Sequence, residues 1–152
     1  MANFEIVTRA EQPTAVLREV VPVKELPQFF GRAYGEVFGA MQAQSLTPTE
    51  APFALYRGIP CETVDVEAGF VAQHPLAPTG AVRSSTLPGG RCVHGVHLGP
   101  YDRMEKTYDE LRKWTLAQHL TLGETMWEVY LSDPRLEPDP EKWRTEFFWP
   151  VS

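Results

Sequence analysis

The chain carries one acidic residue in the middle of a strongly apolar run near its C-terminal end. Residues 127–131 read WEVYL, and this β-branched and aromatic composition predicts a buried β-strand. An unpaired carboxylate costs several kcal/mol to bury. Two partners could explain Glu128: an arginine of the same chain, such as Arg83 or Arg144, or a cationic ligand in an aromatic pocket.

Side chains alternate between the two faces of a strand, so Met126, Glu128 and Tyr130 share one face. The opposite face is wholly apolar and is expected to pack beneath helices; it carries Trp127, Val129 and Leu131. The face of Glu128 is therefore expected to be open to a ligand. Coulomb attraction at low dielectric and cation–π contacts of about 0.5–2 kcal/mol each would favour a lipophilic cation there.

Histidine, cysteine and glycine residues offer weaker candidates for chemistry. His94 and His97 are an odd number of residues apart, so on a strand they point to opposite faces and cannot share a metal ion. Cys61 and Cys92 have no base near them in the sequence, and no phosphate-loop pattern surrounds Gly89. The sequence predicts no metal and no cofactor.

Composition excludes several classes of protein. The 152 residues are 43% hydrophobic and carry a net charge of −6, which suits a folded domain and argues against nucleic acid, because phosphate contacts require a basic face. The same charge is compatible with cationic small molecules. No stretch is long and apolar enough for a signal peptide or a membrane span, and the two cysteines show no disulfide spacing. We expect a cytoplasmic protein that does not bind membranes.

Two halves of the chain show the same pattern of residue types. Corresponding positions lie the same distance apart, as in Leu46 and Leu120, Phe53 and Trp127, and Tyr56 and Tyr130. We predict a single domain, 1–152, built from two copies of one unit, about 1–76 and 77–152. Ala54 and Tyr56 would match Glu128 and Tyr130, so an acid-bearing site would be asymmetric.

Periodicity predicts the elements of each unit. We expect strands at 4–9, 14–20, 53–57 and 62–71 with a helix at 23–44, then strands at 81–87, 91–98, 125–131 and 144–151 with a helix at 101–119. Turn residues at 11–13 and 88–90 predict a β-hairpin at the start of each unit. The prediction is an α+β fold with β-β-α-β-β twice, antiparallel sheets, both long helices on one face, and a ligand cleft between the units on the other face.

Four sequence motifs resemble the GyrI-like small-molecule-binding family. They are GPY at 99–101, Tyr108-x-x-Leu111, WEVYLSDP at 127–134 and TEFFWP at 145–150. The family includes the effector-binding domains of multidrug-sensing transcription regulators of the MerR and AraC classes. The resemblance spans nearly the whole chain, including the duplication.

The resemblance implies a set of ligand-binding residues. Glu128 matches a buried glutamate on the penultimate strand that faces the ligand's positive charge, and Tyr130 matches a pocket residue two positions later. Glu146 and Phe148 match an acid and an aromatic of the final strand, and Tyr101 matches an aromatic at the start of a helix. Two further candidates do not come from the resemblance: Tyr56 is chosen from its place in the duplicated unit, and Met126 because it shares the face of Glu128.

The expected function is binding of lipophilic, cationic or aromatic small molecules, for drug sensing or sequestration. A first alternative is a hydrolase that opens the strained cyclopropane of DNA-alkylating compounds. There Glu128 would orient or deprotonate water, and Tyr130 or Tyr101 would donate a hydrogen bond to the developing phenolate. A second alternative is an inhibitor of a protein partner such as DNA gyrase. The regulators carry a separate DNA-binding region with no counterpart in these 152 residues, so no direct contact with nucleic acid is expected.

Overall fold

A computed structural model describes residues 3–58, 62–133 and 136–152 of the chain. The first half contains β1 (Phe4–Arg9), β2 (Gln12–Pro22), α1 (Leu26–Ala43), β3 (Phe53–Arg57) and β4 (Thr63–Val71). The second half contains β5 (Arg83–Leu87), β6 (Gly90–Leu98), α2 (Met104–Ala117), β7 (Thr125–Tyr130) and β8 (Arg144–Pro150). Short 3-10 helices span Val23–Glu25, Tyr101–Arg103 and Pro140–Lys142. The predicted order β-β-α-β-β, twice over, and the α+β class are confirmed.

Both long helices bury one apolar stripe and end in the same way. The buried stripe of α1 carries Phe29, Ala33, Val37, Ala40 and Met41, and that of α2 carries Met104, Thr107, Leu111 and Thr115. Ser45 and His119 follow the two helices with φ of 57° and 58°, a left-handed conformation that stops helix propagation. Among the described residues, no helix combines the length and the apolarity that crossing a membrane requires.

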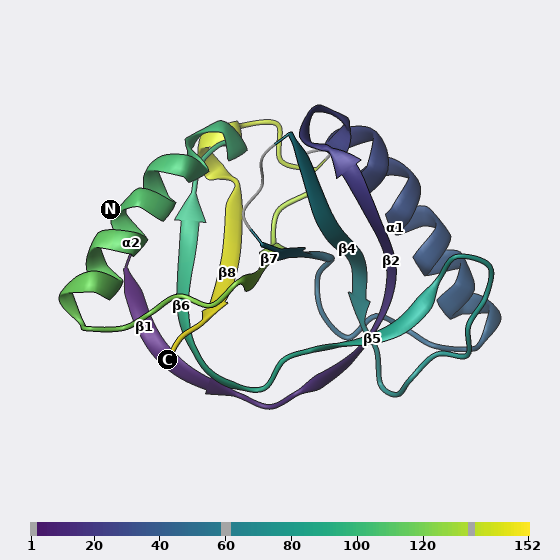
Figure 1. Cartoon of the computed structure of the whole chain (residues 1–152). Helices are drawn as coiled ribbons and strands as arrows, with labels where there is room; N and C mark the ends of the chain where they lie inside the picture. The colour runs from purple at the N-terminus through teal and green to yellow at the C-terminus, as the bar shows by residue number, and fades with distance from the viewer. Residues whose placement is uncertain (1–2, 59–61, 134–135) are drawn as a thin grey trace.

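The eight strands of the described residues form one antiparallel sheet in the order β1-β6-β8-β7-β3-β4-β2-β5 (Figure 1). The two predicted hairpins are wrong, because β1 pairs with β6 and β5 pairs with β2. The first strand of each unit is thus exchanged into the other unit. The linkers that follow β1 and β5 pack closely at Gly89, where a Cβ would lie 2.8 Å from the backbone nitrogen of Glu11. Turn residues signal a change of chain direction, but they do not specify the pairing partner.

The sheet curls, and α1 and α2 flank it on opposite sides of the molecule (Figure 1). Its other face packs against itself and forms a core without helices, whose members come from β2 to β8: Val16, Phe53, Leu55, Val71, Leu87, Cys92, Trp127, Val129 and Phe148. Trp127 and Val129 therefore do not pack beneath the helices, contrary to expectation. Side chains on both faces of β7 are buried, so its apolar residues alone could not indicate which face carries the helices.

Candidate functional site

A cleft of about 860 Å³ lies on the helix-bearing face, between α1 and α2 and over the central strands β3 and β7. The expectation that the cleft would occupy the face opposite the helices is wrong, because the curled sheet fills that face with its own core. The aromatic walls of the cleft consist of Phe30, Tyr34, Tyr56, Phe70, Tyr101 and Tyr130. The charged residues found among the lining are the acids Glu128 and Asp133, and the described lining includes no lysine or arginine.

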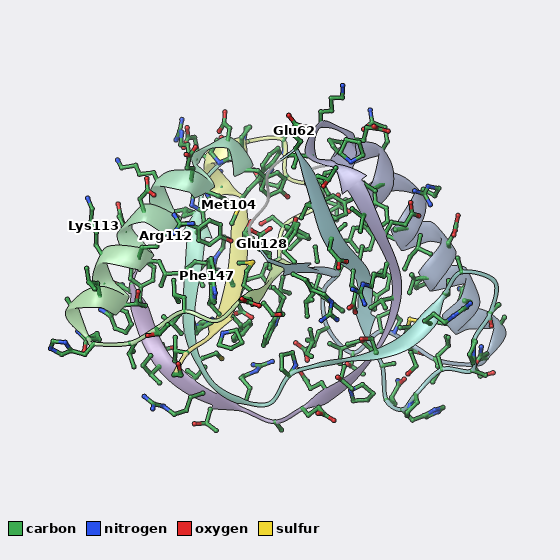
Figure 2. All side chains as sticks on the ribbon, viewed as in Figure 1. Glu62, Met104, Arg112, Lys113, Glu128 and Phe147 are labelled. Atoms are coloured by element: carbon green, nitrogen blue, oxygen red, sulfur yellow. The ribbon has the colours of Figure 1, made fainter. Side chains whose placement is uncertain are left out.

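Glu128 lies in the middle of β7, with 8% of its surface exposed. The hydroxyl of Tyr108 on α2 donates a short hydrogen bond to Oε2 of Glu128, and the hydroxyl of Tyr130 donates to Oε1 at 2.8 Å. In Figure 2 the side chain lies near the middle of the molecule, and Met104 lines the same cleft. The strand sets its direction, and the two phenols hold both of its oxygens.

The alternative of an internal arginine partner is not supported by the geometry. No ion pair between described residues includes Glu128. The guanidinium of Arg83 donates instead to the carbonyl oxygens of Gly80 and Val82, and Arg144 is an exposed residue at the start of β8. The carboxyl of Glu128 therefore has hydroxyl partners and no positive side chain paired with it within the described chain.

Burial raises the pKa of the Glu128 carboxyl above its ordinary value of 4.5, and the hydrogen bonds from Tyr108 and Tyr130 oppose this shift only in part. The buried hydroxyls respond in the same direction. Burial and then the nearby Glu128 raise the pKa of every tyrosine in the chain; these are Tyr34, Tyr56, Tyr101, Tyr108 and Tyr130. All five therefore stay neutral at physiological pH and keep a hydroxyl hydrogen that can be donated, instead of becoming phenolates.

The hydroxyl groups form a chain of hydrogen bonds with a defined direction. The hydroxyl oxygens of Tyr56 and Tyr130 are 3.2 Å apart. Tyr130 has a single O–H, and it donates that hydrogen to Glu128. Tyr56 is therefore the donor to Tyr130, so the chain runs from both Tyr56 and Tyr108 toward the carboxyl. Two strands, β3 and β7, and one helix, α2, contribute one hydroxyl each.

Four of the predicted site residues come together in the cleft: Glu128, Tyr130, Tyr56 and Tyr101. Tyr101 is 41% exposed at the mouth, where its ring meets that of Tyr130 edge-on with centroids 5.9 Å apart. Met126 shares the face of Glu128 but packs with Leu111 and Phe147 in the core under α2, outside the lining described for the cleft.

Glu146 and Phe148 lie on the opposite face of the sheet, so placing them beside Glu128 was wrong. The β7–β8 register pairs Trp127 with Phe148 and Glu128 with Phe147. Phe148 is consequently in the helix-free core, and Glu146 pairs with His94 at 3.3 Å. The last strand presents Phe147 to the helix side, where the absence of a side chain at Gly95 leaves space for its ring.

Sequence reasoning missed several residues of the site. Tyr108 lies one helical turn after Met104, next to the buried stripe of α2, and this spacing was the available signal for it. Tyr34 lies one turn after Phe30 on α1, and the two rings stack with centroids 5.8 Å apart. The Tyr34 hydroxyl donates to the Phe53 carbonyl oxygen at 2.9 Å. No sequence signal marks Phe70, which reaches the cleft from β4.

The histidines have other partners. Both ring nitrogens of His97 are engaged, by the Thr107 hydroxyl at 2.7 Å and the Pro100 carbonyl oxygen at 2.9 Å. His94 lies between Glu5 and Glu146, at 3.0 and 3.3 Å. Within the described ranges, no three His, Cys, Asp or Glu side chains are grouped as metal ligands would be.

Comparison with solved structures supports the same fold. The chain aligns with the EcmrR chain of an EcmrR–DNA complex at a TM-score of 0.87 and 22% identity, covering 99% of this chain and 57% of that one. It aligns with the EcmrR C-terminal domain at a TM-score of 0.80 and 24% identity, covering 100% and 97%. SAV2435 bound to tetraphenylphosphonium aligns at a TM-score of 0.68 and 13% identity, covering 99% and 94%. This chain thus spans little more than half of the EcmrR chain seen with DNA, and identities this low show the fold alone.

No curated protein matches the chain in sequence. The family comparison, in contrast, matches almost its entire length: the GyrI-like small molecule binding domain aligns with residues 2–152. Together with the curled eight-stranded sheet and its two helices, this match means that the chain belongs to the GyrI-like small-molecule-binding family.

Proposed function

We propose that the cleft binds lipophilic small molecules that are cationic or aromatic, in the manner of drug sensing or sequestration, and that Glu128 faces the ligand's positive charge. One observation carries the proposal: a buried carboxyl in an aromatic cleft, with no basic residue in the described lining. A purely structural carboxyl would be expected to have a cationic partner, because burying an unpaired charge is costly.

The residues of the cleft supply two attractive contributions for such a ligand. Coulomb attraction to Glu128 is strong because the surrounding groups exclude water and lower the local dielectric. The rings of Phe30, Tyr34 and Tyr130 offer apolar area and cation–π contacts of about 0.5–2 kcal/mol each. The tetraphenylphosphonium bound to SAV2435 shares this chemistry, since it is a permanent cation wrapped in aromatic rings.

Calorimetric titration at pH 8 with tetraphenylphosphonium, and with triphenylphosphine oxide as its neutral counterpart, tests the proposal. The wild-type protein should bind the cation, and Glu128→Gln should weaken that binding at least tenfold while affecting the neutral compound little. Glu146→Gln is the matched control on the opposite face and should bind like wild type. Equal binding of the cation by wild type and Glu128→Gln, or no binding of aromatic cations at all, would refute the proposal.

A hydrolase is the second candidate, and the hydrogen bonds of Glu128 favour it. A carboxyl with a raised pKa, held by two phenols beside a cleft, is suited to general acid–base catalysis. Water would attack the cyclopropane carbon and give its proton to Glu128, while the breaking C–C bond passes its electron pair to the aromatic system as a phenolate. Tyr130 or Tyr101 would donate a hydrogen bond to that phenolate.

Incubation with an electrophilic cyclopropane compound, followed by product analysis, distinguishes the two functions. A ring-opened product carrying one added water, formed by wild type and not by Glu128→Gln, would establish the hydrolase. Recovery of the compound unchanged after incubation would mean that the cleft binds it without hydrolysing it. The net charge of −6 supports the further proposal that this domain makes no direct contact with nucleic acid.

A further inference from the structure

The surroundings of Glu128 contain several titratable groups, and none of those described neutralises it through an ion pair. His97 on β6 has both nitrogens engaged by Thr107 and Pro100. Arg112 on α2 pairs with Asp109 at 3.1 Å. The titratable groups around the carboxyl come from both helices and from several strands. They are Tyr34 on α1, Tyr56 on β3, His97 on β6, Tyr101 before α2, Tyr108 on α2, Tyr130 on β7, and Asp133 at the rim, whereas Arg112 is exposed on α2 and acts on Tyr108.

The hydroxyl groups around Glu128 suit both the ionised and the protonated carboxyl. The carboxylate accepts hydrogen bonds from Tyr108 and Tyr130. A protonated carboxyl has one O–H to donate, and a phenol oxygen can accept it once the phenol hydrogen has rotated away. Only hydrogen atoms need to move between the two states. The site can therefore hold a neutral carboxyl when empty and a carboxylate when a positive charge is present.

Resting on the function proposed above, we propose that the cleft takes up one monovalent cation in exchange for one proton of the Glu128 carboxyl. In the empty protein at a pH below the pKa of Glu128, the carboxyl is protonated. As the ligand enters, the carboxyl O–H breaks, the proton passes to solvent, and the carboxylate pairs with the ligand's charge. The net charge within the cleft is the same before and after the exchange, because one positive charge leaves as the proton and one enters with the ligand. No oxidant or reductant is required.

Proton exchange makes affinity depend on pH in a defined direction. Below the pKa of Glu128 the ligand must displace a proton, so each rise of one pH unit should tighten binding of a permanent cation up to tenfold. Above that pKa the carboxyl is already ionised and affinity should reach a plateau. Because burial raises this pKa above 4.5, the rising part extends toward neutral pH. A neutral ligand displaces no proton, so its affinity should not rise in this way.

Titration calorimetry of tetraphenylphosphonium from pH 4.5 to pH 8.5, in pairs of buffers with different ionisation enthalpies, measures the exchange directly. The ligand cannot titrate, so protons released on binding come from the protein. The release should approach one proton at the acidic end and fall toward zero at the alkaline end. Glu128→Gln should bind weakly, show no such slope and release no proton, whereas Glu146→Gln should match wild type in both respects.

The outcomes separate this inference from the function on which it rests. Binding that depends on Glu128 but is independent of pH and releases no proton would overturn proton exchange and leave cation binding intact. Unchanged proton release in Glu128→Gln would assign the proton to another group and equally overturn it. Absence of cation binding would refute the proposed function itself. If the variant does not fold, infrared difference spectra of wild type must still show the protonated-carboxyl band disappear on addition of tetraphenylphosphonium.

Discussion

Ala54 lies directly opposite Glu128 in the ladder between β3 and β7, at the centre of the sheet. The two positions correspond in the two halves of the chain, so one half contributes a methyl group where the other contributes a carboxyl. Ala54 is fully buried, and a longer residue there would enter the space beside Glu128. The pairing gives the floor of the cleft one acidic side chain, Glu128, in addition to Asp133 at the rim.

Protonation of Glu128 should be visible in the stability of the empty protein. The folded-state pKa is raised, so the native protein binds more protons than the unfolded chain between the two pKa values, and stability falls as pH rises through the folded-state pKa. Glu128→Gln removes this loss and should gain stability relative to wild type from pH 5 to pH 8. Urea denaturation of both proteins at pH 5 and at pH 8 measures this gain. An equal effect of the substitution on stability at the two pH values would contradict the prediction.

Tyr108 should tune the cleft through its hydrogen bond to Glu128. Tyr108→Phe keeps the ring against Phe147 but removes a donor to the carboxylate, so the pKa of Glu128 should rise further. Binding of tetraphenylphosphonium at pH 7 should weaken about tenfold, corresponding to about 1.4 kcal/mol, and the pH profile should shift upward. Tyr34→Phe is the control, because its hydroxyl donates to the Phe53 carbonyl. An equal shift of the pH profile in both variants would exclude the specific role of Tyr108.

The two faces of the sheet should separate binding from stability. Phe30→Ala removes a ring from the cleft wall, and the lost contact area should weaken aromatic ligands about tenfold. Phe148→Ala opens a cavity in the helix-free core and should destabilise the fold by about 3–5 kcal/mol. At a temperature where it stays folded, it should bind tetraphenylphosphonium as tightly as wild type. A loss of affinity in the folded Phe148→Ala protein would count against the assignment of the two faces.

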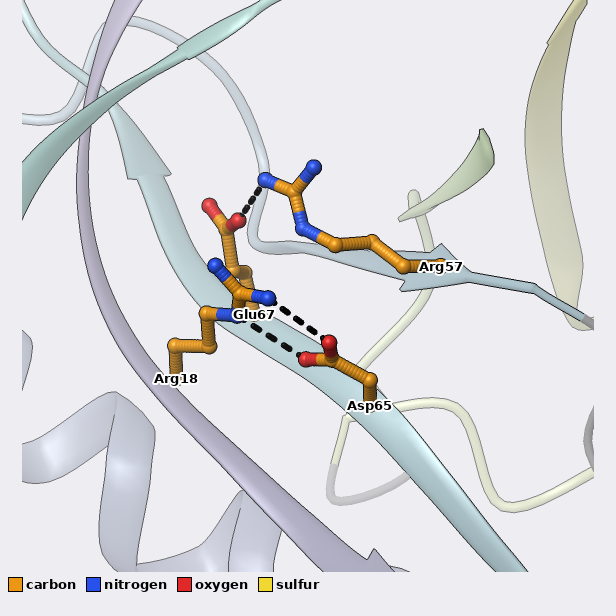
Figure 3. A network of polar contacts seen from close by, with 4 residues as sticks. All are labelled: Arg18, Arg57, Asp65 and Glu67. Carbon is orange, nitrogen blue, oxygen red and sulfur yellow. Dashed lines mark hydrogen bonds and ion pairs between the residues drawn. The ribbon is translucent and has the colours of Figure 1, made fainter. Parts of the chain in front are cut away.

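A second buried glutamate provides a stability test outside the cleft. Glu67 on β4 is 2% exposed and makes a short ion pair with Arg57 on β3, beside the exposed Arg18–Asp65 pair (Figure 3). Arg57→Ala leaves that carboxylate without its cation and should destabilise by about 2–4 kcal/mol, less than for a fully buried pair because Arg57 is partly exposed.

The control for this test is Arg18→Ala, which should cost less than about 1 kcal/mol, as expected for an exposed pair. Both values come from urea denaturation at pH 7. The double variant Arg57→Met/Glu67→Leu should recover part of the loss, since it removes the unpaired charge. Similar effects of the two single substitutions would mean that burial of Glu67 contributes little.

His94 should stabilise the exchanged strand β1 within a limited pH window. Hydrogen bonds to Glu146 and then Glu5 raise the pKa of His94, and His94 lowers the pKa of Glu146. The histidine contribution is therefore lost as pH rises through its folded-state pKa, above 6.5, and the Glu146 contribution is lost as pH falls below about 4.5. The stability difference between wild type and His94→Gln should peak between these limits. The His94 ring also packs on Phe148, with centroids 4.8 Å apart, and a difference independent of pH would show that this packing, not charge, holds the ring.

Several features of the site followed from the sequence because they depend on local periodicity. Strand alternation correctly placed Glu128 and Tyr130 on one face and Trp127 on the other, whatever their surroundings. Helical spacing located α1 and α2, and the matching of Ala54 with Glu128 anticipated the asymmetry of the cleft. Each of these inferences relates residues of one element, or of two elements with the same pattern, and needs no knowledge of strand partners.

Only the tertiary structure decided which elements meet. Three long-range features were not predictable. They are the exchange of β1 and β5, the β7–β8 register that brings Phe147 to the side of Glu128, and the positions of Tyr34 in the cleft wall and of Tyr108 against Glu128. A one-residue change of register turns every side chain of a strand to the other face without altering its own pattern. Apolar residues likewise cover both faces of a curled sheet. The sequence therefore determined that an acid and a phenol share one face of a strand, and the packing of the whole chain decided that this face opens between the helices.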